Sequence, residues 1–168
     1  MTAFRKLLIS VGLFCIAALM HTVAFAGAFE DGKAAYDKKD YGAAQKIWQP
    51  LADQGDAAAQ FWIGLMHQNG SGVAQDYAEA MKWHRLAADQ GYSAAQISVG
   101  MMYSEGKGVA QDAVQAYKWL SLVADKPDAD PGDKQVATLF RGIGTTKMTP
   151  EHVAEGKRLA AEWKPVTK

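Results

Sequence analysis

Apolar residues recur along residues 77–88 at the i, i+3, i+4 spacing that places them on one face of a helix. Asp76 lies directly before this stretch, and Glu79 lies in its first turn. The two residues form a capping box, in which the Asp76 side chain accepts hydrogen bonds from free N–H groups of the first turn. The pattern therefore predicts an amphipathic helix that opens at Asp76. Its apolar face consists of Tyr77, Ala80, Met81, His84 and Ala88.

Another helix is predicted directly before this one. On a helical wheel of about 100° per residue, Ala59, Ile63 and Met66 fall within one narrow arc, which indicates the core face. Gly70 and Gly72 follow, and glycine accepts the left-handed backbone angles that end helices. This part of the chain thus predicts a pair of helices joined by a glycine loop.

The helix pair occurs twice. Residues 58–93 align with residues 94–129 without a gap, and 17 of the 36 aligned positions are identical, which is far more than chance gives. Asp112 and Gln115 form the capping box of the second copy, and Ser93 with Gln96 is expected to open its first helix in the same way. The alignment therefore predicts a duplicated unit of 36 residues.

Two glycines, Gly64 and Gly100, lie inside predicted helices one period apart. A glycine inside a helix costs roughly 1 kcal/mol relative to alanine. Their recurrence at equivalent positions predicts that a neighbouring helix approaches closely at each of them.

The flanking segments complete an all-α architecture. Residues 29–57 fit a shorter unit, whereas the repeat register fails at Asp130. A capped helix is predicted from Thr149 to about Trp163, where it would cover the end of the stack. The expected fold is an α/α superhelical solenoid with one C-terminal capping helix. Its parts are units at about 29–57, 58–93 and 94–129, a repeat domain over 27–126, and a helical cap over 130–168.

The period separates this repeat from other helical repeats, because tetratricopeptide units have 34 residues, ankyrin units 33, and HEAT or armadillo units 40 or more. The unit has a Gly-x-Gly-Val loop, then Gln-Asp, then Ala-x-x-Trp. The residues of this pattern are Ala59, Gly64, Gly70, Gly72, Val73, Asp76, Ala80, Trp83, Ala87 and Ala88, and their counterparts are Ala95, Gly100, Gly106, Gly108, Val109, Asp112, Ala116, Trp119 and Ala124. With these residues the unit resembles the Sel-1-like repeat family. That resemblance implies a tetratricopeptide-like superhelix used mostly as a protein-interaction adaptor, with exported bacterial relatives often in the periplasm and some regulating membrane-bound sensors.

Residues 1–26 have the layout of a secretory signal peptide. Arg5 and Lys6 precede an uncharged, mainly apolar run over 7–20, and Ala24 and Ala26 supply the small residues of a cleavage site before Gly27. An uncleaved anchor is the alternative, although the run is shorter than the roughly 20 residues that span a bilayer. Cleavage after Ala26 would place the mature protein in the periplasm or the medium, without stable membrane insertion.

Charge and cysteine content narrow the classes of function. The whole chain has 18 basic and 18 acidic residues, and cleavage would leave 16 basic and 18 acidic ones. This balance argues against nucleic-acid binding, which needs a basic excess. The single cysteine, Cys15, lies in the leader and follows Phe14, which is a poor lipid-attachment sequence. The mature chain would have no cysteine, so it departs from the branch of the family with a disulfide in each repeat.

No residue pattern predicts an enzyme, a metal site or a cofactor. Ser104 and Lys107 fit the Ser-x-x-Lys motif of penicillin-recognising enzymes, but the partner motifs are absent and the other repeat has Gln68 and Ser71 there. The histidines are also expected to be structural. His67 and His84 align with Tyr103 and Leu120, and His152 has no second ligand at helical spacing.

The same helical wheel gives a candidate binding surface. Phe61, Leu65 and Gln68 lie opposite the core face, and Ile97, Met101 and Ser104 occupy that side one period later, with Trp62 at the edge. First helices line the inner wall of such superhelices, so these residues are predicted to form an apolar strip along a partner-binding groove. Two alternatives stay open: Phe61 and Ile97 pack against the adjacent first helix, or the tail helix covers the strip.

The sequence therefore favours an exported, non-enzymatic adaptor that binds another protein or peptide. One alternative is a structural protein that self-associates as an envelope scaffold. The remaining alternative is a Ser-x-x-Lys penicillin-recognising enzyme.

Overall fold

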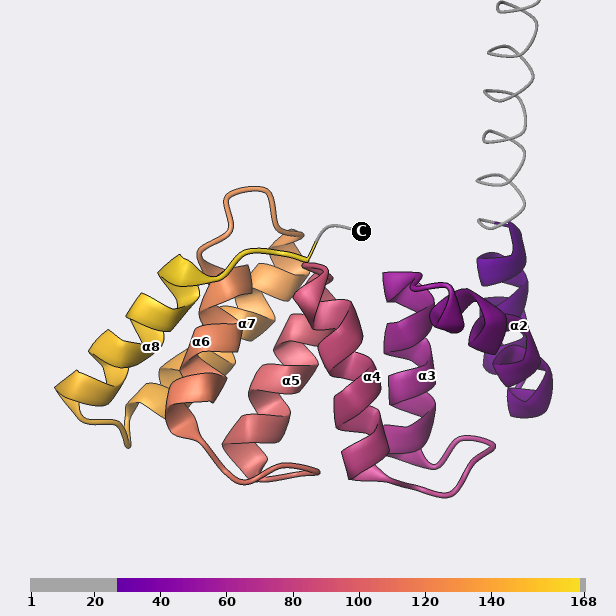
Figure 1. The fold of residues 1–168 in the computed structure, drawn as a ribbon, viewed down its shortest axis with the longest axis horizontal. Helices are drawn as coiled ribbons and strands as arrows, with labels where there is room; N and C mark the ends of the chain where they lie inside the picture. Colours follow the sequence, from indigo (N-terminus) through magenta and orange to yellow (C-terminus); the bar gives the residue numbers. More distant parts are fainter. Residues whose placement is uncertain (1–26, 167–168) are drawn as a thin grey trace, which may run out of the picture.

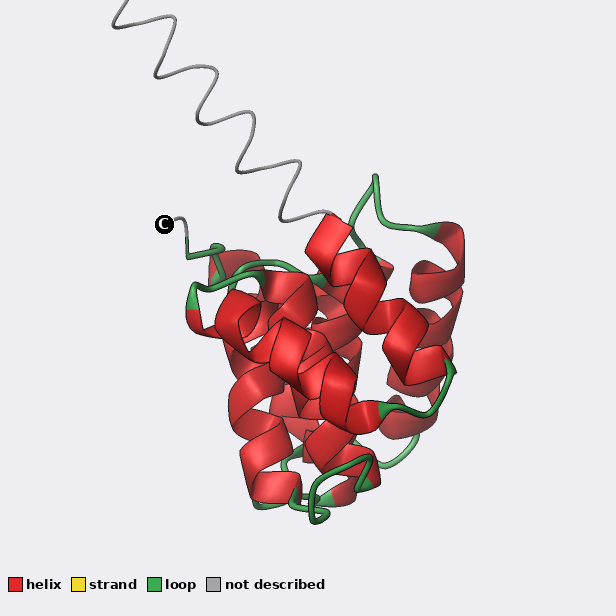
Figure 2. Cartoon of the chain, turned by 90° about the vertical axis from the view of Figure 1, so that its right-hand side faces the viewer, coloured by secondary structure: helices red, strands yellow, loops and turns green. Residues whose placement is uncertain are grey.

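Every regular element among residues 27–166, the part that the computed structural model describes, is an α-helix (Figures 1 and 2). The predicted all-α class is thus confirmed. The predicted leader, with Ala24 and Ala26, lies outside the described residues, and Gly27 is the first residue within them. Residues 27–37 are helical, followed by α2 (Tyr41–Asp53), α3 (Ala57–Asn69), α4 (Tyr77–Asp89), α5 (Ser93–Glu105), α6 (Ala113–Ala124), α7 (Pro131–Thr145) and α8 (Pro150–Glu162).

The helices form a solenoid. Each helix from α2 to α6 packs against the next one along the chain, so the helices follow one another across the molecule (Figure 1). Within a repeat unit we call α3 and α5 the first helices, and α4 and α6 the second helices. This arrangement confirms the predicted helical-repeat solenoid.

The predicted ends of these helices are largely correct. Asp76 accepts hydrogen bonds from the Ala78 and Glu79 N–H groups at 2.9 and 3.0 Å, and Asp112 caps α6 in the same way. Gly70 and Gly106 end the first helices with left-handed φ angles of 70° and 69°. These local signals therefore fix both ends of the loop in each unit.

The predicted cap at Ser93 is wrong. Ser93 is the first residue of α5, and Tyr92 is the N-cap without a side-chain hydrogen bond. Gln96 instead donates its amide N–H to the Ala88 carbonyl at 3.2 Å, which ties α5 to the end of the preceding helix. The glutamine side chain is therefore used between two helices and not within the first turn of one.

Consecutive units contact each other through the second glycine of each loop. Gly72 lies against Tyr41, the first residue of α2, and Gly108 lies against Tyr77, the first residue of α4. Both glycines have positive φ angles, of 76° and 70°, and leave no room for a Cβ. Gly108 and Tyr77 each lie 36 residues after Gly72 and Tyr41, so the two contacts are equivalent. Helix α2 therefore occupies the place that the second helix α4 has in the next unit.

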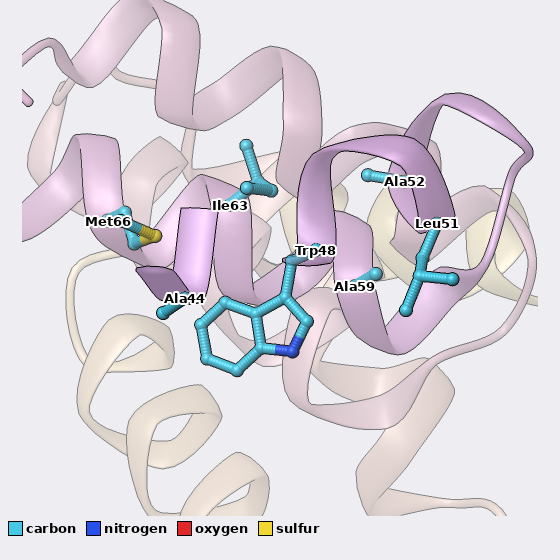
Figure 3. Close-up of a cluster of buried hydrophobic side chains, with 7 residues drawn as sticks. All are labelled: Ala44, Trp48, Leu51, Ala52, Ala59, Ile63 and Met66. Atoms are coloured by element: carbon cyan, nitrogen blue, oxygen red, sulfur yellow. The ribbon is translucent and has the colours of Figure 1, made fainter. Parts of the chain in front are cut away.

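The core is divided into clusters along the stack. The first joins α2 and α3 around Trp48, and it includes the predicted core residues Ala59, Ile63 and Met66 (Figure 3). Another surrounds Trp119, which is completely buried. The third brings Ile97 of α5 together with residues of α6 and with Ala137 of α7. Burial of these side chains supplies the main stabilising term of the fold.

Two helices, and not one, follow the repeats. The unpredicted helix α7 has Asp130 as its N-cap, which accepts from the Gly132 N–H at 2.8 Å, and Pro131 at its first position. The predicted tail helix is present as α8, with Thr149 as N-cap and Trp163 as C-cap.

Helix α8 turns back onto α6. A Cβ on Gly156 would lie 2.7 Å from the Tyr117 ring, and the Trp163 and Trp119 rings are 6.3 Å apart. The tail then runs on (Figure 1) until the Val166 N–H donates to the Asp89 carbonyl at 2.8 Å. The tail helix therefore covers α6, and α8 lies at the end of the molecule opposite α2 (Figure 1), while α7 packs against both α5 and α6.

Candidate functional site

The predicted apolar strip is not continuous. Ile97 is only 7% exposed, and it packs with Leu120 and Ala137 in the third cluster, so its placement on an open groove is wrong. Phe61 is partly buried, with its ring 5.4 Å from both the His84 and Tyr92 rings. Neighbouring helices, α7 among them, thus occupy much of the surface that the helical wheel left open.

The other residues of the strip lie in different surroundings. The Trp62 ring packs 5.0 Å from that of Trp48, and Gln68 Oε1 lies 2.9 Å from His84 Nε2. Leu65 is half-buried. Met101 packs against the third cluster, while Ser104 is exposed at the end of α5. Of these residues, Ser104 alone lines the pocket described next.

A pocket of about 420 Å³ lies where the end of α5 meets α6 and α7. Its volume falls within the range of about 300–1,000 Å³ that is usual for ligand pockets. Apolar side chains of α6 and α7, together with Met148 just after α7, form much of its wall, whereas α5 contributes only the polar Ser104. The lining residues are Ser104, Gln111, Ala113, Ala116, Tyr117, Leu120, Phe140, Arg141, Ile143, Gly144, Lys147 and Met148.

Two cations and no carboxylates belong to this lining. Arg141 Nη1 donates to Ser121 Oγ at 3.2 Å and to Asp125 Oδ2 at 2.6 Å, and the guanidinium lies 5.7 Å from the Tyr117 ring centre. These contacts hold the guanidinium beside the pocket. Lys147 provides the other positive charge, so the pocket favours an anionic group near its rim.

The outer face of α7 is apolar and uncovered. Val136, Leu139 and Ile143 are 39%, 60% and 58% exposed, whereas Ala137 is the buried residue of this helix. Their i, i+3, i+7 spacing forms a stripe, which we call the α7 stripe, and Ile143 also lines the pocket. The repeat pattern does not indicate this stripe or the pocket, because the segment after Asp130 does not align with the repeat.

The Ser-x-x-Lys residues do not form a catalytic pair. Lys107 Nζ lies 2.8 Å from Glu105 Oε2, and this hydrogen bond raises the pKa of Lys107, whereas a general base needs a lowered one. The Ser104 carbonyl accepts from the Gln111 amide at 2.7 Å, a contact that Gln75 and Gln68 repeat one unit earlier. The arrangement is therefore part of the repeat loop.

Within the described residues, no group of three or more histidine, cysteine, aspartate or glutamate side chains could hold a metal ion. His84 is fully buried, and burial lowers its pKa from 6.5 to about 4. It is neutral at neutral pH and packs on Gly64. None of the helices found between residues 27 and 166 is long and apolar enough to cross a membrane.

The helical stack and the repeated loop contacts define an α-helical repeat protein. The particular repeat is the Sel1 repeat, because its family model matches residues 57–92 and 93–128, each beginning one residue before the units aligned above. Residues 57–128 are two Sel1 repeats, which confirms the resemblance carried by the glycine loops and Trp83. Proteins of this kind are generally non-enzymatic scaffolds that mediate protein interactions. No curated protein matches the chain.

Two solved structures are similar to the chain over most of its length. One is a protective antigen present in uropathogenic Escherichia coli strains that displays an SLR fold, with a TM-score of 0.74 and 28% identity. The other is a Sel1 repeat protein from Oxalobacter formigenes, with a TM-score of 0.63 and 27% identity. The matches cover 83% and 81% of this chain, which spans 29% and 56% of those two proteins.

Proposed function

We propose that this protein is an exported, non-enzymatic adaptor that binds another protein through the α7 stripe and the adjoining pocket. Sel1 repeats typically serve as protein-interaction modules, which supports the class of function. The observation that carries the proposal is the exposure of Leu139 and Ile143, about 60% each, beside a pocket in the same surface. Contiguous exposed apolar surface of this kind is typical of interaction sites.

Export is supported by the leader. Arg5 and Lys6, the apolar run that follows them and the Ala24-Phe25-Ala26 sequence are what a signal peptidase substrate needs. The proposed location is therefore the periplasm or the medium. N-terminal sequencing of the protein from its native cells is expected to begin at Gly27, and retention of Arg5 would contradict export by cleavage.

The absence of enzymatic activity is supported by the pairing of Lys107 with Glu105, which leaves Ser104 without a basic partner at hydrogen-bond distance among the described residues. A labelled penicillin is expected to leave Ser104 unmodified. Covalent labelling that the Ser104→Ala variant abolishes would support the enzyme alternative instead.

Substitution within the α7 stripe tests the adaptor proposal. Leu139→Glu places a charge on the exposed stripe and should retain the helical signal and melting temperature while losing the partner that the parent protein captures. Leu86→Glu is the matched control, because Leu86 is 50% exposed on α4, away from the stripe. Loss of capture in both variants, or in neither, would contradict the assignment of this surface.

Self-association is the second candidate function, and the charges of α7 favour it specifically. Asp133 lies in the first turn of α7 and Lys147 just after its end. Two copies of the helix in antiparallel contact would pair these opposite charges around the apolar stripe. A dimer that forms with rising concentration in light scattering, and that Leu139→Glu abolishes, would favour this scaffold function. A monomer at all concentrations would rule it out.

A further inference from the structure

Some glycines inside the helices receive a side chain from another helix. In the described residues a Cβ added to Gly64, Gly100 or Gly156 would lie 2.7–2.8 Å from the side chain that covers it. Each of these glycines therefore permits a contact that alanine would block. The pairs are Gly32 with Trp48, Gly64 with His84, Gly100 with Leu120, and Gly156 with Tyr117.

Gly142 and Gly144 of α7 have no such cover. No atom beyond the helix itself lies within 4 Å of a Cβ added to either residue. Each costs roughly 1 kcal/mol of helix stability relative to alanine, without a contact in return. Gly144 faces the pocket, whereas Gly142 does not belong to its lining. The pocket thus leaves Gly144 open, whereas Gly64, Gly100 and Gly156 are each covered by a side chain.

The charge beside Gly144 indicates what fills this space. Arg141 is paired with Asp125, and both of its hydrogen bonds within residues 27–166 use Nη1, so Lys147 is the cation of the pocket without a paired carboxylate. No carboxylate of the described chain lies within 4.0 Å of Lys147. Charge complementarity therefore favours an anionic ligand.

We infer that the pocket binds an acidic peptide segment of the partner, with one bulky apolar side chain of that segment seated on Gly144. The inference deepens the proposed adaptor function and rests on it. Leu120, Phe140 and Met148 supply the apolar wall for the side chain, and Arg141 and Lys147 lie where its acidic neighbours would be.

The surroundings of the pocket fit an extended chain. Ser104 and Gln111 add a hydroxyl and an amide to the rim, which can bond with the backbone of a bound peptide. The α7 stripe continues from the pocket through Ile143 to Leu139, so residues next to the seated side chain would meet apolar surface. A peptide is bound in this way by one buried anchor and a polar rim.

A defined peptide tests the inference. The probe is a fluorescein-labelled Gly-Ser-Glu-Trp-Glu-Gly-Ser peptide, measured by fluorescence anisotropy with the whole mature protein. Binding is expected to weaken about tenfold or more when the tryptophan becomes alanine or when both glutamates become lysine. Added salt should also weaken binding, because the charges on the rim are exposed to solvent.

The glycines supply a matched pair of variants. Gly144→Leu fills the pocket and should weaken binding about tenfold or more, whereas Gly142→Leu should leave it unchanged. Lys147→Gln should weaken binding of the probe with two glutamates. It should not weaken binding of the peptide in which lysine replaces both glutamates. If Gly144→Leu does not fold, amide NMR of the unmodified protein still decides, since the probe should shift the Gly144 signal and leave the Gly32 signal in place.

Three results would overturn the inference. They are no binding of the tryptophan probe, equal binding by the Gly142→Leu and Gly144→Leu variants, and binding of laurate at Gly144 without binding of the peptide. If the probe fails while Leu139→Glu still abolishes partner capture, the peptide chemistry is wrong and the adaptor proposal stands. If the probe binds while Leu139→Glu leaves capture unchanged, the pocket is a peptide site separate from the adaptor surface.

Discussion

His84 is completely buried where the next repeat has Leu120, and both side chains lie on a helical glycine. Its Nε2 faces Gln68 Oε1 at 2.9 Å, so Nε2 carries the proton and donates. Its Nδ1 is buried without a hydrogen-bond partner. A second proton would therefore place a charge on an unsolvated nitrogen, which explains why burial lowers the pKa to about 4.

His84 should make stability dependent on pH. The ordinary pKa of 6.5 applies to the unfolded chain and a pKa of about 4 to the folded one, so the unfolded state binds more protons between these values. The stabilisation is complete above pH 6.5 and is lost as pH falls toward 4, by ~3 kcal/mol in total. In His84→Leu this loss should be absent. A difference in unfolding free energy from the parent that stays constant over this range would contradict the assignment.

The two kinds of helical glycine should respond oppositely to alanine. In Gly100→Ala the new Cβ would lie 2.8 Å from Leu120 Cγ, and such overpacking costs about 1–3 kcal/mol. In Gly142→Ala nothing obstructs the Cβ, so higher helix propensity should raise the unfolding free energy by about 0.5–1 kcal/mol. Chemical denaturation measures both, and a stabilised Gly100→Ala would show that α5 and α6 are farther apart.

At the scale of elements, local signals predicted most helices. The Asp76 and Asp112 caps and the Gly70 and Gly106 ends lie where the sequence placed them, because each depends on a few adjacent residues. Helix α7 was missed, although its N-cap and its i, i+3, i+7 apolar spacing are in the sequence, because its residues do not align with the repeat. The Ser93 cap failed because a tertiary contact uses Gln96 elsewhere.

Trp119 should be a major source of stability for α6. It is fully buried against Trp163, with the Arg85 and Lys118 cations 4.7 and 4.5 Å from its ring centre. Trp119→Ala should cost about 3–5 kcal/mol, the usual range for a buried aromatic side chain. Trp83→Ala is the matched control, because Trp83 is only partly buried at the equivalent position and should cost less. Equal small shifts in melting temperature for both variants would contradict this difference.

At the scale of the whole molecule, the sequence predicted the solenoid but neither the pocket nor the α7 stripe. Periodicity identifies which residues are equivalent between units, and so predicts the stack. It does not determine what covers the last unit: α7 buries Ile97, and α8 packs on α6 instead of on α7. Ser104 was the one predicted residue that belongs to the pocket, and its partners Arg141 and Lys147 come from the segment beyond the repeats.

The central claim is that the exposed apolar face of α7 is where this protein binds a partner. Site-specific photo-crosslinking in the native cells tests it most directly, with a benzophenone amino acid in place of Leu139 and, as a control, in place of Ala161 on the exposed side of α8. A discrete crosslinked protein at Leu139 and none at Ala161 is the predicted result. Crosslinks at both positions alike, or at neither, would contradict it.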